Sequence, residues 1–185
     1  MSDDDNEREE YVYVLDFLPQ GRAEDRTHHE PIVQGVGEKN FTLLELVARG
    51  DAQINIGERI YVGSGKRDKV ERVKRRLSYD ELTSSSKAEL EYAVKAIIED
   101  NEDRFIDFFN DAQSVTIRLH QLDLLPGIGK KLRNGILDER KIEPFDSFED
   151  LEDRVSGLHN PKDILSERIV NEIQDEDLKY RIFAR

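Results

Sequence analysis

The chain has no cysteine and no tryptophan among its 185 residues, and it has a single methionine. Without cysteine it has no disulfide framework, no thiol nucleophile and no cysteine-bound zinc or iron–sulfur site. It also lacks a run of 18 apolar residues and begins with the acidic, polar stretch MSDDDNEREE, so the sequence predicts neither a membrane span nor a secretory signal. We therefore expect a soluble, cytoplasmic protein with no membrane partner.

Positive charge is scarce as well. The chain has 41 acidic and 28 basic side chains, which gives a net charge of −13 at pH 7 and argues at first against a nucleic-acid-binding protein. Arginine outnumbers lysine by 17 to 11 and the acids are spread over the chain. This pattern resembles the proteins of salt-loving archaea, in which surface acidity maintains solubility. A basic cluster in such a chain therefore carries more weight as a candidate binding site.

The N-terminal half of the chain predicts a small β-barrel. Residues 1–10 have six acids and one arginine, and we expect a disordered tail there. Between residues 11 and 78, segments rich in β-branched and aromatic residues predict strands, with glycines suited to bends and one short helix among them. The number and length of these segments favour an OB- or S1-like barrel. The predicted strands are residues 11–19, 31–38, 52–65 and 69–77, and the predicted helix is residues 41–50.

Barrels of this class bind single-stranded nucleic acid through a basic groove and stacking aromatics. We expect most of the aromatic candidates, Tyr11, Tyr13, Phe17 and Tyr61, to belong to the core. The basic candidate is the segment 59–76, which is equally compatible with a nucleic-acid-binding edge of the barrel and with a solvated surface. It has only two acids, and its basic residues are Arg59, Lys66, Arg67, Lys69, Arg72, Lys74, Arg75 and Arg76.

Residues 79–112 predict two acidic linking helices, and residues 113–185 predict an all-α domain. The first linking helix has an apolar face and begins after Ser86, which forms a capping-box pattern with Glu89. The predicted fold class is therefore α+β, a barrel followed by a helical domain. The predicted helices are residues 87–99, 102–110, 114–124, 130–141 and 164–173.

The most informative segment is the pentapeptide Leu-Pro-Gly-Ile-Gly at residues 125–129, which is followed by two lysines. The proline cannot continue a helix, and the glycines can adopt positive φ and leave room for a ligand against the backbone. The pattern predicts a tight turn that exposes backbone N–H groups at the start of a helix, where the helix dipole favours an anion. We interpret that anion as a nucleic-acid phosphate, which such a contact positions without reading bases. The candidate contact residues are Leu125, Gly127, Ile128, Gly129, Lys130, Lys131 and Arg133.

This segment resembles the turn of the helix-hairpin-helix family of DNA- and RNA-binding modules. Downstream, PFDSFEDL at residues 144–151 is similar to the segment that links paired hairpins in that family, and we expect Ser147 to cap the helix that follows. VSGLH at residues 155–159 resembles a degenerate second turn, with a histidine in place of the second glycine. Residues 118–141 have six basic and three acidic side chains, whereas residues 143–177 have three and twelve. The first hairpin is therefore the predicted phosphate contact, and the second is a structural partner.

Over nearly its full length the chain is similar to an uncharacterised archaeal family, domain of unknown function 655, for whose members RNA or nucleotide binding has been suggested. The resemblance rests on the segments YVYVLDFLPQG, GERIYVG, LHQLDLLPGIGKK, PFDSFEDL and KYRIF. It implies an N-terminal barrel, a C-terminal helix-hairpin-helix and a general binding role, and it implies no reaction. Two residues depart from the hairpin pattern. Arg133 stands where a small residue is common, and Gly135 lies inside the second helix, at a cost of about 1 kcal/mol.

The sequence offers little for catalysis. Glu149 and Asp150 stand where base-excision glycosylases of the hairpin class have an aspartate, but the catalytic lysine of those enzymes has no counterpart in the second helix. His28 and His29, with acids nearby, form the densest potential metal group, although adjacent loop side chains usually diverge. The GSGK segment at residues 63–66 lacks the spacing of a phosphate-binding loop and predicts a turn. We expect no enzymatic activity, no metal and no cofactor.

Two functional hypotheses follow. The leading one is a non-enzymatic nucleic-acid-binding protein, with RNA favoured over DNA because of the predicted barrel. The alternative is a protein-interaction adaptor whose helical domain and acidic faces dock a basic partner, such as a ribosomal or translation-related protein.

Overall fold

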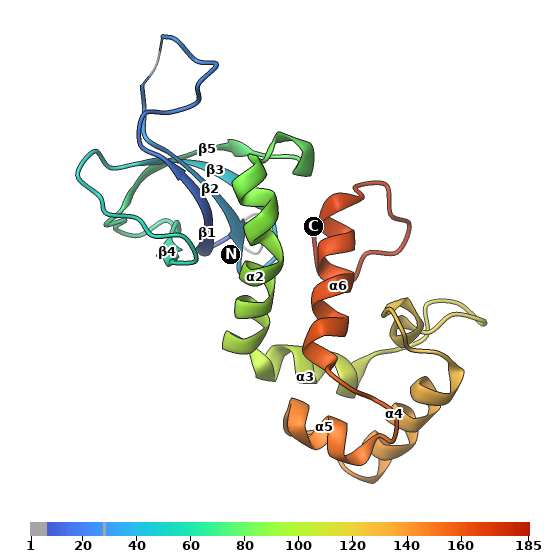
Figure 1. Ribbon diagram of the computed structural model, residues 1–185. Helices are drawn as coiled ribbons and strands as arrows, with labels where there is room; N and C mark the ends of the chain where they lie inside the picture. Colours follow the sequence, from blue (N-terminus) through green and yellow to red (C-terminus); the bar gives the residue numbers. More distant parts are fainter. Residues whose placement is uncertain (1–6, 28) are drawn as a thin grey trace. The chain divides into compact units, whose positions relative to one another are not determined.

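The computed structural model describes residues 7–27 and 29–185, so most of the predicted disordered tail lies outside the described residues. Within these residues the fold is a mixed α+β arrangement of five strands and five α-helices, which confirms the predicted class (Figure 1). Short 3-10 helices lie at Tyr79–Glu81 and, as η2, at Gln121–Leu124. The strands are β1 (Tyr11–Leu18), β2 (Ile32–Gly37), β3 (Leu43–Ala48), β4 (Arg59–Tyr61) and β5 (Val70–Arg76). The helices are α2 (Ser84–Asp100), α3 (Glu102–Asp111), α4 (Lys130–Ile142), α5 (Phe148–Arg154) and α6 (Pro161–Gln174).

The strands form one curled sheet, a half-barrel, in the order β4-β1-β2-β3-β5, and every neighbouring pair is antiparallel. β4 and β5 are consecutive in sequence but lie at opposite edges, so residues 62–69 connect one edge of the sheet to the other. Register shifts in β1 between Val14 and Asp16, and in β3 after Glu45 and Val47, bend the strands. These irregularities help the sheet to curl around its own inner face.

The inner face of the half-barrel is a compact apolar core to which all five strands contribute. Burying one aliphatic side chain of this size stabilises a fold by about 1.5–3 kcal/mol. The cluster is therefore a principal source of stability for the sheet. Its buried members are Val12, Val14, Val33, Leu46, Ala48, Ile60, Val62 and Val70.

The start of α2 is fixed to the sheet by a chain of polar contacts. Thr83 Oγ1 accepts a hydrogen bond from the N–H of Ser86 at 3.1 Å and donates to Asp16 Oδ2 at 2.6 Å. The predicted cap, Ser86, is instead buried in the first turn of the helix, where its hydroxyl donates to Gln34 Oε1 at 2.7 Å. The capping-box prediction is therefore wrong: the cap is Thr83, three residues earlier, and the Ser86 hydroxyl is hydrogen-bonded to Gln34 of β2.

The helix predicted over residues 41–50 is also wrong, because β3 occupies its centre. This strand pairs with β2 on one side and β5 on the other, and five of its six residues are buried. A strand buried on both faces has no polar alternation to distinguish it from a buried helix. In the strand predicted over residues 52–65, only Arg59–Tyr61 is paired as β4, and Gly57 turns the chain before it with φ of 83°.

Most of the helix predicted over residues 114–124 is absent. Residues 114–120 form a narrow loop, closed by a β-bridge between Ser114 and His120, and only Gln121–Leu124 is helical. Three successive β-branched residues, 115–117, lose side-chain freedom in an α-helix and disfavour it here. The predictions for α3, α4, β1, β2 and β5 are confirmed.

The chain divides into two compact units. One contains the described residues up to Val94 together with Glu172–Arg185, and the other is Lys95–Asn171. Within the described part of the chain, no helix combines the length and apolar character needed to cross a bilayer.

Arginine side chains cap helix ends in the second unit. Arg140 donates to two backbone carbonyls at the C-terminal end of α3, at 3.0 and 2.8 Å. Arg154 donates to two at the end of α4, both at 2.7 Å. The last carbonyls of a helix have no partner within it and are the negative end of its dipole, so a guanidinium there is stabilising. These arginines are therefore structural groups and not free surface charge.

Glu172 anchors the last residues of the chain. Its side chain is fully buried, and Oε1 accepts hydrogen bonds from the backbone N–H groups of Ile182, Phe183 and Ala184, at 2.9, 2.9 and 3.1 Å. The guanidinium of Arg181 donates to the Glu172 carbonyl at 2.6 Å. One carboxylate thus satisfies three successive backbone donors.

We predict that Glu172→Ala lowers the free energy of unfolding by about 2–4 kcal/mol, because it leaves partly buried N–H groups without an acceptor. Chemical denaturation would measure the change. Glu176→Ala, at an exposed acid nearby in the sequence, is the control and should change stability by less than about 0.5 kcal/mol. Equal effects of the two substitutions would contradict the anchoring role of Glu172.

Candidate nucleic-acid interface

The pentapeptide at residues 125–129, called here the first turn, connects η2 to α4. Leu125 and Ile128 are buried, and the N–H of Ile128 donates to the carbonyl of Leu125 at 3.3 Å. Gly127 has φ of 77°, a conformation that strongly favours glycine. The apolar side chains therefore hold the turn from inside while its glycines form the outer surface.

The outer surface of the first turn exposes backbone donors. Gly129 is the N-cap of α4, and the first bond of the helix runs from the N–H of Arg133 to the Gly129 carbonyl at 3.0 Å. Among the described residues, none accepts a hydrogen bond from the N–H of Gly129, Lys130 or Lys131. A Cβ built on Gly127 or Gly129 would meet nothing within 4 Å, and both lysine side chains are exposed. An anion can therefore approach these donors directly, at the positive end of the helix dipole.

Residues 155–159, called here the second turn, connect α5 to α6 with the same backbone arrangement. Gly157 has φ of 87°, and the N–H of the buried Leu158 donates to the carbonyl of Val155 at 3.2 Å. These features correspond to Gly127, Ile128 and Leu125 of the first turn. The two turns therefore share a backbone geometry although their sequences differ.

At the second turn, a side chain of the same chain accepts a hydrogen bond from the exposed backbone N–H. Asn160, which directly precedes α6 as Gly129 precedes α4 but has φ of 51°, donates its N–H to Glu152 Oε1. The next residue, Pro161, has no N–H to offer. An internal carboxylate thus occupies the place that is open to solvent at the first turn. The sequence gives no signal for this role of Glu152, because the two partners are eight residues apart and meet only when the turn between them folds.

A polar network beneath the first turn holds η2 against α4. Arg133 NH1 contacts both oxygens of Asp123, at 3.1 and 2.9 Å. Asp123 Oδ2 accepts from the N–H of His120 at 2.8 Å, and His120 Nδ1 accepts from the N–H of Leu122 at 3.1 Å. Arg133, a predicted contact residue, is therefore committed to Asp123 and positions the turn. The spacing of His120 and Asp123, three residues apart, is a capping-box pattern that could have indicated this network.

The second departure from the hairpin pattern, Gly135, lies where α4 meets the second turn. A Cβ at this position would lie 3.3 Å from Cγ1 of Val155, closer than ordinary van der Waals contact. The glycine therefore allows Val155 to approach α4 closely.

Carboxylates neutralise most of the basic segment 59–76. Lys66 and Arg67 have no carboxylate partner among the described residues, and Arg76 donates to the backbone oxygen of Arg185 at 2.6 Å. The interpretation as a largely solvated, ion-paired surface therefore suits this segment better than an open basic edge. The ion pairs are Arg59 with Glu38, Lys69 with Glu58, Arg72 and Lys74 with Glu30, and Arg75 with Glu45 and Glu81.

The aromatic candidates are engaged within the first unit. Tyr13 is buried, and Phe17 packs against the inner core. The guanidinium of Arg59 lies 3.5 Å from the ring centroid of Tyr11, which also packs edge-to-face on Tyr61 with centroids 5.4 Å apart. The structure thus leaves no obvious open stacking platform among these four residues.

The acids considered for catalysis, Glu149 and Asp150, lie in the first turn of α5. Glu149 is exposed, and the predicted cap Ser147 is confirmed, since its hydroxyl accepts from the N–H of Asp150 at 3.0 Å. The N–H of Asp146 and the Arg154 guanidinium hold the pKa of Asp150 below its usual value. His28 lies outside the described residues. Among those described, no group of three or more histidine or acidic side chains is arranged to hold a metal ion.

The network beneath the first turn predicts that the stability of the fold depends on pH through His120. Burial and, less strongly, the charge of Arg140 lower the pKa of His120, and protonation of Nδ1 would remove the acceptor for Leu122. Since the pKa is lower in the folded state, the unfolded chain takes up the proton first as the pH falls, and stability declines below about pH 6.5.

We expect His120→Asn, which keeps a capping oxygen, to reduce this decline between pH 7 and about pH 5.5, above the range in which most carboxylates titrate. Thermal denaturation of both proteins across this range measures the difference. An unchanged pH dependence in the variant would show that the cap does not respond to protonation.

The comparisons with known proteins agree with this description of the fold. The family profile described as protein of unknown function (DUF655) matches residues 8–185. An uncharacterised protein of Methanocaldococcus jannaschii, MJ0038, is 43% identical over 178 residues, which cover 96% of this chain and 80% of that protein. The crystal structure of Af1531 from Archaeoglobus fulgidus, of the same family, aligns with a TM-score of 0.88 at 46% identity, covering 96% of this chain and 100% of that one. The chain therefore belongs to the DUF655 family of proteins of unknown function.

Proposed function

We propose that the chain is a non-enzymatic nucleic-acid-binding protein whose first turn, acting as a helix-hairpin-helix, binds backbone phosphates. The observation that carries the proposal is the contrast between the two turns. The turns share the conformation of their first glycine and the hydrogen bond of the buried residue after it. At the second turn Glu152 accepts from the N–H of Asn160, whereas at the first turn the donors are open and two exposed lysines follow. A carboxylate in the one place indicates that an anion suits the other.

The chemistry of the first turn favours a phosphodiester over a protein carboxylate. Three adjacent N–H groups and two ammonium groups can serve several oxygens of one or two phosphates. A backbone contact of this kind positions a strand without specifying its sequence. We therefore expect binding with little base preference and with a marked dependence on salt.

The proposed preference for RNA over DNA depends on the half-barrel. A partly open five-stranded barrel is the architecture of the OB class, in which a sheet face and the loop between strands 4 and 5 bind oligonucleotides. In this chain that loop is residues 62–69, which include Lys66 and Arg67. We limit the proposed contribution of the barrel to these two cations, because their basic neighbours are paired with carboxylates.

We predict that Lys130→Glu combined with Lys131→Glu weakens binding of single-stranded RNA by at least about tenfold, because it replaces two favourable charges with two repulsive ones. The salt slope of the affinity should also become shallower by about one for each phosphate that the variant no longer neutralises. Fluorescence anisotropy with labelled RNA and DNA of the same sequence, at matched salt, measures affinity, slope and preference together.

The matched control is Lys141→Glu, because Lys141 is also an exposed lysine of α4 but lies at its opposite end. It should change the affinity much less than the double substitution. If the double variant folds normally, as judged by its circular dichroism and melting temperature, and binds RNA and DNA as tightly as the parent, the proposal is wrong.

One observation favours the alternative, an adaptor for a basic protein partner. Ile117 is fully exposed in the loop that precedes η2, and Val115, two residues earlier, is 37% exposed. Two exposed aliphatic side chains in one short loop suit a protein contact. Partners that remain after nuclease treatment of the purified native protein, and that no longer bind after Ile117→Asp, would favour the adaptor.

A further inference from the structure

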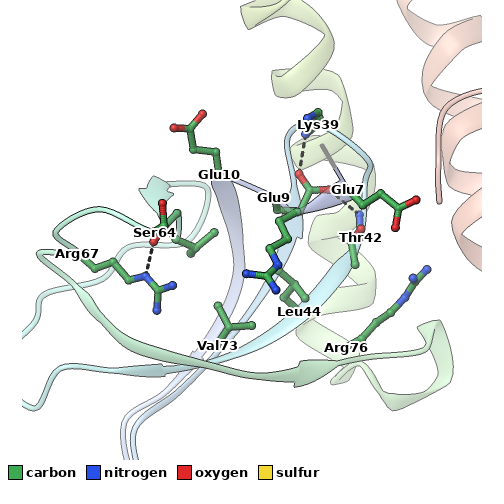
Figure 2. A pocket seen from close by; sticks show the side chains of 13 residues that line it. Glu7, Glu9, Glu10, Lys39, Thr42, Leu44, Ser64, Arg67, Val73 and Arg76 are labelled. Atoms are coloured by element: carbon green, nitrogen blue, oxygen red, sulfur yellow. Dashed lines mark hydrogen bonds between the residues drawn. The ribbon is translucent and has the colours of Figure 1, made fainter. Parts of the chain in front are cut away.

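A pocket of about 620 Å³ opens at the mouth of the half-barrel, between the two edges of the sheet that do not pair with each other (Figure 2). The apolar side of the pocket is formed by Val62, Leu44 and Val73. Val62 is a member of the inner core, and Leu44 packs against that core. The volume of the pocket lies within the range of small-molecule sites, and barrel mouths are a common place for them. The pocket is thus of the right size and character for a small organic ligand.

One wall of this pocket is a loop that its own contacts hold in place. Arg67 Nε donates to the carbonyl of Gly63 at 2.7 Å, and Tyr61 Oη accepts from the N–H of Gly65 at 2.8 Å. A Cβ at Gly63 would lie 2.5 Å from that same hydroxyl, so a larger residue there would require Tyr61 to move. Among the described residues, none accepts a hydrogen bond from the N–H of Gly63 or Ser64, and both residues line the pocket. Both residues therefore lie on the wall with backbone N–H groups that no described residue uses.

Positive charge in the pocket is not cancelled in the way it is on the neighbouring surface. Arg8 and Arg67 line the pocket, and neither has a carboxylate partner among the described residues. The lining acid Glu9 is buried, and backbone N–H groups at the β2–β3 turn donate to both of its oxygens. Glu7 and Glu10 are exposed, and Figure 2 shows the carboxylate of Glu10 pointing away from Leu44. Two guanidinium groups without a carboxylate partner among the described residues thus line the pocket beside its apolar surface.

We propose that this pocket binds a phosphate-bearing ligand of mononucleotide size. The phosphate would lie at the Gly63–Ser64 backbone between the guanidinium groups of Arg8 and Arg67, which suit the oxygens of a phosphate. The base or another planar apolar group would pack on Leu44, Val62 and Val73. A free nucleotide and the 5′-terminal nucleotide of a strand share this chemistry. The inference is independent of the first turn, because no residue of that turn lines the pocket.

The test is an NMR titration of the ¹⁵N-labelled full chain, followed at the amides of Gly63, Ser64 and Gly65. The probes are adenosine 5′-monophosphate, adenosine, and one short RNA with either a 5′-phosphate or a 5′-hydroxyl. We expect the phosphorylated probes to shift these amides. We also expect Arg8→Gln and Arg67→Gln to weaken that binding by at least about tenfold. Arg26→Gln, at an exposed arginine of the same unit that does not line the pocket, is the matched control and should change the affinity by less than about twofold.

The outcomes distinguish a free nucleotide from the 5′ end of a strand as the ligand, and the pocket from the first turn as the site. Shifts with the free monophosphate identify a nucleotide as the ligand, and shifts with the 5′-phosphorylated RNA alone identify a strand end. The proposal is overturned if adenosine binds as well as its monophosphate, or if no phosphorylated probe shifts the loop amides. It is also overturned if Lys130→Glu with Lys131→Glu abolishes the response, since the shifts would then report binding at the first turn. Persistence of the response in that double variant, together with loss of RNA affinity, supports two separate sites.

Discussion

Backbone N–H groups at tight turns need acceptors, and in this protein buried or adjacent carboxylates supply them. Glu9 accepts from three N–H groups at the β2–β3 turn, and Glu172 accepts from three near the end of the chain. Glu152 serves the second turn in the same way. The first turn exposes a comparable set of donors for which no described residue supplies an acceptor. The first turn therefore differs from the other three places in having no carboxylate of the described residues as its acceptor.

Many of the basic side chains also have structural partners within the chain. Arg140 and Arg154 cap helix ends, Arg133 holds η2 against α4, and most of the basic segment 59–76 is paired with acids. A count of basic residues in the sequence therefore overstates the charge available to a ligand. At Lys130 and Lys131, exposed cations lie beside open backbone donors.

The sequence predicts elements whose signals are local and misses those that depend on distant partners. Ser147 caps α5 as its position indicates, because an N-cap bond spans only three residues. The helix predicted in place of β3 is wrong because the identity of this strand comes from pairing on both sides. The geometry of the first turn follows from its glycines, but the commitment of Arg133 to Asp123 requires knowing that η2 and α4 are neighbours. The role of Glu152 cannot be predicted in this way, because it follows only from the folded loop.

The carboxylate that fills the second turn belongs to the same chain, so it competes there at an effective concentration that dilution cannot lower. Effective concentrations across short flexible connections are on the order of millimolar. A phosphate would have to displace Glu152 against that concentration and would gain only one N–H, because the next residue is Pro161. We therefore expect any phosphate bound through the two turns to occupy the first turn alone at ligand concentrations below that value.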